Sequence, residues 1–211
     1  MPTRQEMRAE ETKKAILKAA EQLFASRGYD EVTMREIAKA AGCSHTTIYI
    51  YFKDKEMLLF QLSKEPLQTL KQTFENILSD EKTHPDIRLK AIFIEVIKFC
   101  LSNRNMYTTF FMAQATRVDE EDPALEINNL RNHLFSQLRA AIAACLNLKN
   151  TDEFALGCAR IFFFTLQGIL VTYLNPNEPL PELMERLTPT FDLAVDVMLI
   201  GFKHTVKKED K

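Results

Sequence analysis

Residues 33–55 read TMREIAKAAGCSHTTIYIYFKDK, and they predict two short helices joined by a tight turn. Thr33 and Glu36 have the spacing of a capping box, which would begin a helix that ends near Gly42. Ser44 is suited to cap a second helix over residues 45–52. Two short helices with glycine in the connecting turn have the form of a helix-turn-helix.

The second of these helices is predicted to have two unlike faces. At about 100° per residue, Ile48 and Phe52 share one face, which can pack into a core. Thr46 and Ile50 point away from that face, and Tyr49 flanks them. An outward face of hydroxyl and methyl groups suits a helix that lies in a DNA major groove. There, hydroxyls can reach base edges or phosphates, and methyl groups can meet thymine methyls.

The composition excludes several other classes of protein. The chain has 211 residues, 46% of them hydrophobic, and a formal net charge of −2, which excludes overall disorder. Five glycines argue against a sheet-rich fold and against glycine-rich phosphate loops. The four cysteines form no C-x-x-C pair, and we expect a soluble, cytoplasmic chain with free thiols, no signal peptide and no membrane span. We also expect no cofactor and no metal site.

Helical periodicity continues to the end of the chain and predicts an all-α fold. Residues 1–53 would form a three-helix domain, with its first helix at about 9–27, and residues 54–211 a six-helix bundle. Pro66 predicts a break or kink near Glu65. The helical segments of the bundle are expected at about 54–78, 86–102, 104–117, 122–147, 151–174 and 182–206.

The N-terminal part resembles a known family in a run of about 45 residues. The matching residues are Ile16, Ala19-Ala20, Leu23-Phe24, Gly28-Tyr29, Thr33-Met34-Arg35-Glu36-Ile37-Ala38, Ala41-Gly42-Cys43-Ser44 and Ile48-Tyr49-Ile50-Tyr51-Phe52-Lys53-Asp54-Lys55-Glu56-Met57-Leu58-Leu59. This run looks like the DNA-binding domain of the TetR family of one-component bacterial transcriptional regulators. Cys43 departs from it, because the family often carries an aliphatic residue there, and Pro66 is a second departure.

The resemblance implies about nine helices, a homodimer joined through the last two helices, and a second domain that holds a small-molecule effector. It also implies a repressor that the effector releases from a palindromic double-stranded DNA operator, although activators occur in the family. By position, the DNA contacts would fall on Thr33, Arg35, Ser44, His45, Thr46, Thr47, Tyr49, Tyr51 and Lys55. Of these, the N-terminal residues His45, Thr46 and Thr47 are expected to contact bases, and Tyr49, Tyr51 and Lys55 to contact phosphates.

The C-terminal part offers candidates for an effector pocket and for a dimer interface. Aromatic residues and polar breaks in apolar runs are typical of a cavity for an apolar ligand. The pocket candidates are Phe93, Tyr107, Phe111, Gln114, Phe163 and Gln167. The apolar stripe of the last helix, together with a small residue in the helix before it, gives the interface candidates Gly168, Phe191, Val195, Met198 and Phe202.

Other interpretations remain open at this point. Residues 1–60 hold ten Lys/Arg and nine Asp/Glu, so their net charge alone does not identify a nucleic-acid partner. His45 has no other histidine at ligand spacing, which disfavours a metal site, and oxidation of Cys43 would be a route to redox sensing. The rival functions are an activator of the same family, a ligand-binding adaptor without DNA binding, and a helical enzyme.

Overall fold

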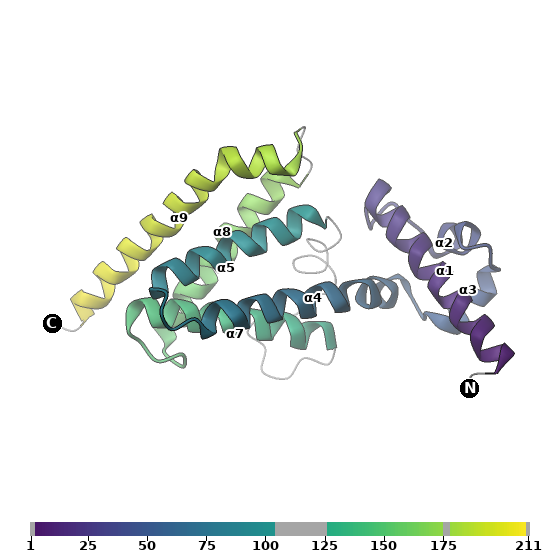
Figure 1. Ribbon diagram of the computed structural model, residues 1–211, viewed down its shortest axis with the longest axis horizontal. Helices are drawn as coiled ribbons and strands as arrows, with labels where there is room; N and C mark the ends of the chain where they lie inside the picture. Colours follow the sequence, from purple (N-terminus) through teal and green to yellow (C-terminus); the bar gives the residue numbers. More distant parts are fainter. Residues whose placement is uncertain (1–2, 104–125, 175–177, 210–211) are drawn as a thin grey trace. The chain divides into compact units, whose positions relative to one another are not determined.

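The computed structural model describes residues 3–103, 126–174 and 178–209, which are helical apart from short connections (Figure 1). No strand occurs within these residues, so the prediction of an all-α fold is confirmed. The helix expected at 104–117 lies outside the described residues. The described helices are α1 (Arg4–Arg27), α2 (Met34–Ala40), α3 (His45–Tyr51), α4 (Lys55–Ser79), α5 (Pro85–Ser102), α7 (Glu126–Leu146), α8 (Glu153–Tyr173) and α9 (Leu180–Glu209).

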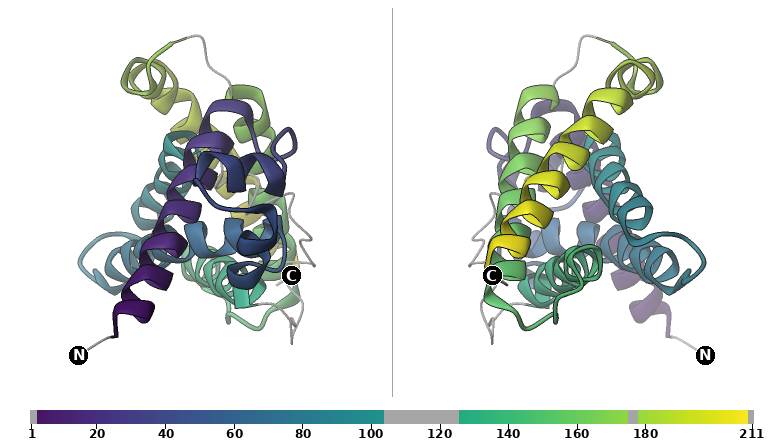
Figure 2. Two further views of the ribbon diagram at one scale, coloured as in Figure 1. Left: turned by 90° about the vertical axis from the view of Figure 1, so that its right-hand side faces the viewer. Right: turned by 90° about the vertical axis from the view of Figure 1, so that its left-hand side faces the viewer.

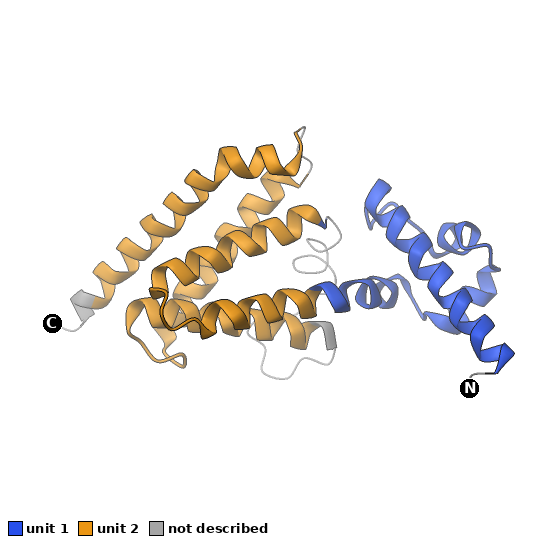
Figure 3. Cartoon of the chain, viewed as in Figure 1, with its two compact units in different colours: residues 1–66, 103–114 blue, residues 67–102, 115–211 orange. Residues whose placement is uncertain are grey.

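The chain divides into two compact units, coloured separately in Figure 3. Among the described residues, the first unit comprises 3–66 and Asn103, and the second begins at Leu67. The first unit includes the first turns of α4, because these supply Leu58 and Leu59 to its core.

Helix caps define the ends of the three N-terminal helices. The Thr33 side chain accepts a hydrogen bond from the Glu36 amide at 3.3 Å, and the Thr33 amide donates to Glu36 Oε2 at 2.9 Å. This completes the expected capping box of α2. Gly28 ends α1 with φ 83°, a backbone conformation that favours glycine, and its amide donates to the Phe24 carbonyl. The turn between α2 and α3 contains Gly42 at φ 70° for the same reason.

One apolar core joins α1, α2, α3 and the start of α4. Phe24 of α1, Ile37 of α2, and Ile48 at the centre of α3 are almost completely buried, as is Phe52, which ends α3. Burial of one such side chain contributes about 1.5–3 kcal/mol to folding. Because Ile48 and Phe52 are buried as predicted, the opposite face of α3 must point outward.

Of the break or kink expected near Glu65, the break is wrong, because α4 is continuous from Lys55 to Ser79 with Pro66 inside it. Proline removes one backbone donor from a helix interior, at a cost of about 3 kcal/mol. Buried residues on both sides of Pro66 favour the continuous helix: Leu59 precedes it, and Leu67 and Leu70 follow it. The helix crosses the boundary between the two units at this residue.

The second unit is a helical bundle in which both α5 and α7 pack against α8 and α9. Phe93 of α5 meets Phe162 of α8 edge-on, with ring centres 5.8 Å apart. Figure 2 shows α9 lying across α5 and α8. Two ion pairs fix the alignment of α5 with α9: Lys90 pairs with Asp196 at 2.7 Å, and Lys203 pairs with Asp86 at 2.6 Å.

Candidate nucleic-acid interface

The outward face of α3 is the main candidate surface. Ile50 is 76% exposed and Tyr49 is 47% exposed, and His45 and Thr46 are also exposed. These four side chains form two rows along the helix. His45 and Tyr49 make one row, in which the two rings meet edge-on with centres 5.1 Å apart. Thr46 and Ile50 make the second, aliphatic row, because residues four apart lie on one side of a helix.

Three predicted contact residues have hydroxyl groups that serve the helix ends. The Ser44 hydroxyl accepts from the Thr47 amide at 3.0 Å and lies 2.7 Å from the Thr47 hydroxyl. The Thr33 hydroxyl donates to Glu36 Oε2 at 2.7 Å. Ser44 and Thr33 are exposed and Thr47 is half-buried. Their hydroxyls therefore position α2 and α3 before any nucleic acid is bound.

The first unit also carries exposed cations on α2 and just after α3. Arg35 and Lys39 are exposed on α2, and Lys53 is exposed just after α3. Within the part of the chain that the structure describes, none of the three forms a hydrogen bond or ion pair with its side chain. Arg27, in contrast, donates to Glu36 Oε1 at 2.7 Å and to the Glu31 carbonyl at 2.9 Å. Arg35, Lys39 and Lys53 are thus among the cations available to a phosphate backbone.

Lys55, the predicted phosphate contact at the start of α4, is bound within the protein. Its ammonium donates to the carbonyls of Tyr29 at 2.7 Å and Val32 at 3.0 Å, and it lies 3.5 Å from that of Asp30. The same nitrogen sits 4.2 Å from the centre of the Tyr29 ring. Burial, helped by nearby carboxylates, raises the pKa of Tyr29 to about 12. Lys55 therefore clamps the loop between α1 and α2.

Tyr51 and Cys43 are directed toward the interior of the first unit. Both are partly buried and pack against its apolar core. Burial raises the pKa of the Cys43 thiol above its usual value, so the thiol stays protonated at neutral pH. Since the thiolate is the form that is oxidised, this environment argues against redox sensing by Cys43. Among the described residues, no group of three or more His, Cys, Asp or Glu is placed to hold a metal ion.

The effector-pocket candidates are only partly placed by the structure. Phe93 is fully buried in the core of the second unit. Phe163 and Gln167 of α8 are half-buried, and the Phe163 ring meets that of Phe135 at 6.1 Å. The remaining candidates, Tyr107, Phe111 and Gln114, lie outside the described residues.

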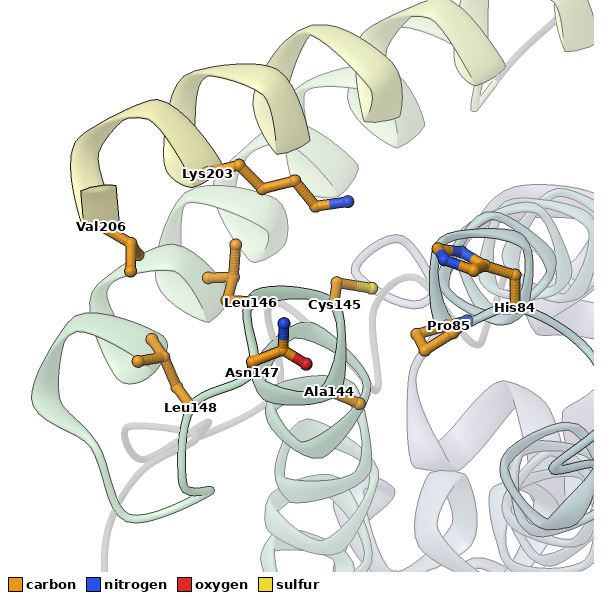
Figure 4. A pocket seen from close by; sticks show the side chains of 9 residues that line it. All are labelled: His84, Pro85, Ala144, Cys145, Leu146, Asn147, Leu148, Lys203 and Val206. Carbon is orange, nitrogen blue, oxygen red and sulfur yellow. The ribbon is translucent and has the colours of Figure 1, made fainter.

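A cavity of about 570 Å³ lies elsewhere in the second unit, near the end of α9 (Figure 4). It is lined by His84, Pro85, Ala144, Cys145, Leu146, Asn147, Leu148, Lys203 and Val206. None of the described pocket candidates lines it. Lys203 extends into this region in Figure 4, but its ammonium already pairs with Asp86 at 2.6 Å. The Lys203 ammonium is therefore already paired within the protein.

The interface candidates on α9 differ in their exposure. Phe191 is 2% exposed and Val195 is 1% exposed, so both belong to the core of the protomer itself. Met198 and Phe202 are half-buried, and Phe202 packs on Phe162. Gly168 of α8 is exposed, as a contact with a partner requires. The exposed large apolar side chains of the two helices are Ile161, Phe164 and Val171 on α8 and Leu193, Val197 and Ile200 on α9.

These exposed residues recur at intervals of three or four residues, with Gly168 in the same series, and each set therefore follows one face of its helix. By length and composition, α8 is the one helix among those that the structure describes that could cross a membrane, and a third of its most apolar 18-residue stretch is buried. The exposed apolar face of α8 explains why the helix is so apolar and yet only partly buried. Periodicity alone missed it, because α9 carries apolar residues on two faces.

Sequence reasoning also missed a buried polar pair on α7. Asn128 is 1% exposed and Arg131 is 3% exposed, and the Arg131 guanidinium donates to Asn128 Oδ1 at 2.8 Å. Burial lowers the pKa of Arg131 to about 10. Within the described residues, the buried Asn128 Nδ2 has no hydrogen-bond acceptor. The polar residues of the segment 126–137 were the available signal for this pair.

Comparison with known proteins places this geometry in a family. Residues 16–62 match the family model described as bacterial regulatory proteins, tetR family. A fatty acid metabolism regulator protein of Bacillus subtilis is 37% identical over 68 residues, which are 32% of this chain and 35% of that protein. The alignment thus spans about a third of the length of this curated relative.

Solved structures extend the likeness to most of the chain. The fatty acid degradation regulator FadR of Bacillus halodurans aligns with a TM-score of 0.63 at 20% identity, covering 89% of this chain and 94% of that one. FadR of Bacillus subtilis in complex with stearoyl-CoA aligns with a TM-score of 0.50 at 20% identity, covering 90% and 96%. At these identities the structures support the fold. Residues 16–62, which hold the caps, core and outward face of α1–α3, therefore match the N-terminal domain of the TetR family of bacterial regulatory proteins, and the solved structures extend that fold to most of the chain.

Proposed function

We propose that this protein is a ligand-responsive transcriptional repressor that binds a palindromic DNA operator as a homodimer in the cytoplasm. The observation that carries the proposal is the outward face of α3, where Thr46 and Ile50 are exposed beside the His45–Tyr49 pair. A short helix held by a buried core on one side and open on the other fits a major groove.

Electrostatics supports a nucleic-acid partner for this face. Arg35, Lys39 and Lys53 have side chains without an acidic partner among the described residues, although the net charge of the N-terminal part is small. Such cations are free to replace the counterions of a phosphate backbone. Ser44, Thr33 and Lys55 contribute indirectly, because they hold the helices and the α1–α2 loop in place.

The homodimer is proposed from the exposed apolar faces of α8 and α9. Phe164 is 63% exposed, Val197 is 60% exposed and Ile200 is 69% exposed. Contiguous exposed apolar surface marks interaction sites in soluble proteins. A second copy of the chain is the occupant that a palindromic operator requires, because operator symmetry mirrors the two-fold symmetry of the protein.

The effector is proposed to be apolar with a polar or anionic end. The aromatic side chains of the bundle, including Phe135 and Phe163, favour an apolar ligand. The buried Asn128 Nδ2, which has no acceptor among the described residues, offers a donor to a carbonyl, carboxylate or phosphate. The likeness to regulators named for fatty acid metabolism, one of them solved with stearoyl-CoA, supports an acyl compound. Binding would favour a state with lower affinity for DNA.

Selection from random double-stranded DNA tests the proposal. The purified chain should enrich one palindrome whose half-sites are about 34–36 Å apart, or a multiple of that distance. Thr46→Ala should change the preferred sequence, whereas Lys82→Ala, in the exposed loop between α4 and α5, should leave it unchanged. Enrichment of no sequence would contradict the proposal and favour an adaptor that binds protein.

An activator is the second candidate within the same class. The exposed α3 face is equally compatible with both roles, because a bound dimer can block or recruit the polymerase. Transcription in vitro from a promoter that contains the selected operator distinguishes them. The proposal predicts less transcript when the protein is added and recovery of transcript when a library of acyl compounds is added. A rise in transcript on addition of the protein would establish an activator.

A further inference from the structure

Ile50 is the most exposed large apolar side chain in the part of the chain that the structure describes, at 76%. Most of the other strongly exposed apolar residues lie in the recurring series on α8 and α9. Ile50 instead stands in the aliphatic row of α3, one helical turn from Thr46. It contributes nothing to the core, since Ile48 and Phe52 occupy that side of the helix.

We propose that Ile50, together with the methyl group of Thr46, recognises the C5-methyl groups of thymines in the operator. The inference rests on the proposed DNA-binding function and names the base that it reads. In the major groove, thymine is the standard base that presents a methyl group, and apolar side chains discriminate it by contact. An apolar side chain can contact the thymine methyl group, but it cannot accept a hydrogen bond from the cytosine amine. It therefore favours thymine over cytosine.

The geometry of α3 also sets the spacing of the thymines. Thr46 and Ile50 are four residues apart, which is about 6 Å along the helix axis. Successive bases on one strand are about 3.4 Å apart, so the two methyl contacts fall about two base steps from each other. Each half-site should therefore contain a thymine for Ile50 and a second thymine about two steps away. The neighbouring row of His45 and Tyr49 leaves this aliphatic row unobstructed.

Removal of the methyl group from the DNA tests this contact directly. In the selected operator, each thymine is replaced in turn by deoxyuridine, which pairs identically but lacks the C5-methyl group. A replacement in one half-site should weaken binding of the wild-type protein about fourfold, and the same replacement in both half-sites about fifteenfold. Ile50→Ala loses the contact in both half-sites, so it should bind the normal operator about fifteenfold more weakly and should be insensitive to deoxyuridine at that same position.

The variant Ile87→Ala is the matched control, because Ile87 is 59% exposed on α5 in the second unit. It should show the wild-type response to every deoxyuridine. Ile50→Ala should fold normally, since the side chain is outside the core, and circular dichroism checks this. The inference is overturned if Ile50→Ala and wild type respond equally to every deoxyuridine, or if the selected half-site contains no thymine. In either case DNA binding itself would still support the proposed function. Failure of the wild-type protein to bind any specific DNA would overturn both.

Discussion

Lys55 provides the sharpest prediction about the first unit. The change is Lys55→Met, which keeps most of the apolar stem and removes the ammonium. That ammonium donates to the carbonyls of Tyr29 and Val32, at 2.7 and 3.0 Å, and lies 4.2 Å from the Tyr29 ring centre. Hydrogen bonds to a charged group contribute about 1.5–3 kcal/mol, and a cation–π contact about 0.5–1 kcal/mol. Partial exposure of Lys55 reduces these values, and we expect a loss of about 2 kcal/mol.

The assay is hydrogen exchange followed by mass spectrometry on a peptide that covers residues 28–36. A loss of about 2 kcal/mol in the free energy of opening corresponds to roughly 30-fold faster exchange of the protected amides in this loop. Lys53→Met is the matched control, because Lys53 is exposed and its side chain has no partner among the residues described here. It should leave the exchange rates of the loop unchanged.

DNA binding separates the clamp from a direct phosphate contact. As a clamp, Lys55 supports the position of the loop, so Lys55→Met should lower affinity without changing the slope of log affinity against log salt. Lys53→Met should flatten that slope by about two units for a dimer, since each protomer loses about one phosphate contact. Unchanged exchange together with a flattened slope in Lys55→Met would refute the clamp and support the phosphate contact.

Three further predictions concern other parts of the chain. The Arg27 guanidinium and the hydroxyl and amide of Thr33 hold the pKa of Glu36 at about 2, so ionised Glu36 stabilises the α2 cap above its ordinary pKa of 4.5, and this contribution is lost as the pH falls through about 2. Arg27→Gln should raise that pKa in an NMR titration, and an unchanged value would contradict the assignment. Phe164→Glu with Val197→Glu should convert a dimer into monomers in light scattering, whereas a persistent dimer would place the interface elsewhere. Burial raises the pKa of Cys43, so peroxide should leave DNA affinity unchanged at neutral pH, and a peroxide-dependent loss would revive redox sensing.

The architecture of the first unit was predictable because its signals are local. The spacing of Thr33 and Glu36 predicts the cap that the structure contains, and the four-residue spacing of Ile48 and Phe52 predicts the buried face of α3. Once that face is fixed, the outward direction of Thr46 follows from helical geometry alone. Caps, turns and faces depend on residues that are close in sequence, so one sequence suffices to predict them.

Other features depended on contacts between distant residues. The carbonyls that bind Lys55 lie 23 to 26 residues earlier in the chain, and nothing in the local pattern distinguishes a clamped lysine from a free one. On α9, both Phe191 and Val197 belong to apolar stripes, but only packing within the bundle decides that Phe191 is buried and Val197 exposed. At Pro66, packing on both sides of the proline overcame a local preference for a break.

Direct binding of the purified protein to DNA tests the central claim. The measurement is fluorescence anisotropy with the DNA that flanks its own gene, titrated against salt and against random DNA of equal length. The account predicts specific binding by two protomers per site, with affinity that falls steeply as salt rises. Equal affinity for flanking and random DNA at every salt concentration, together with no sequence enriched from a random pool, would contradict it.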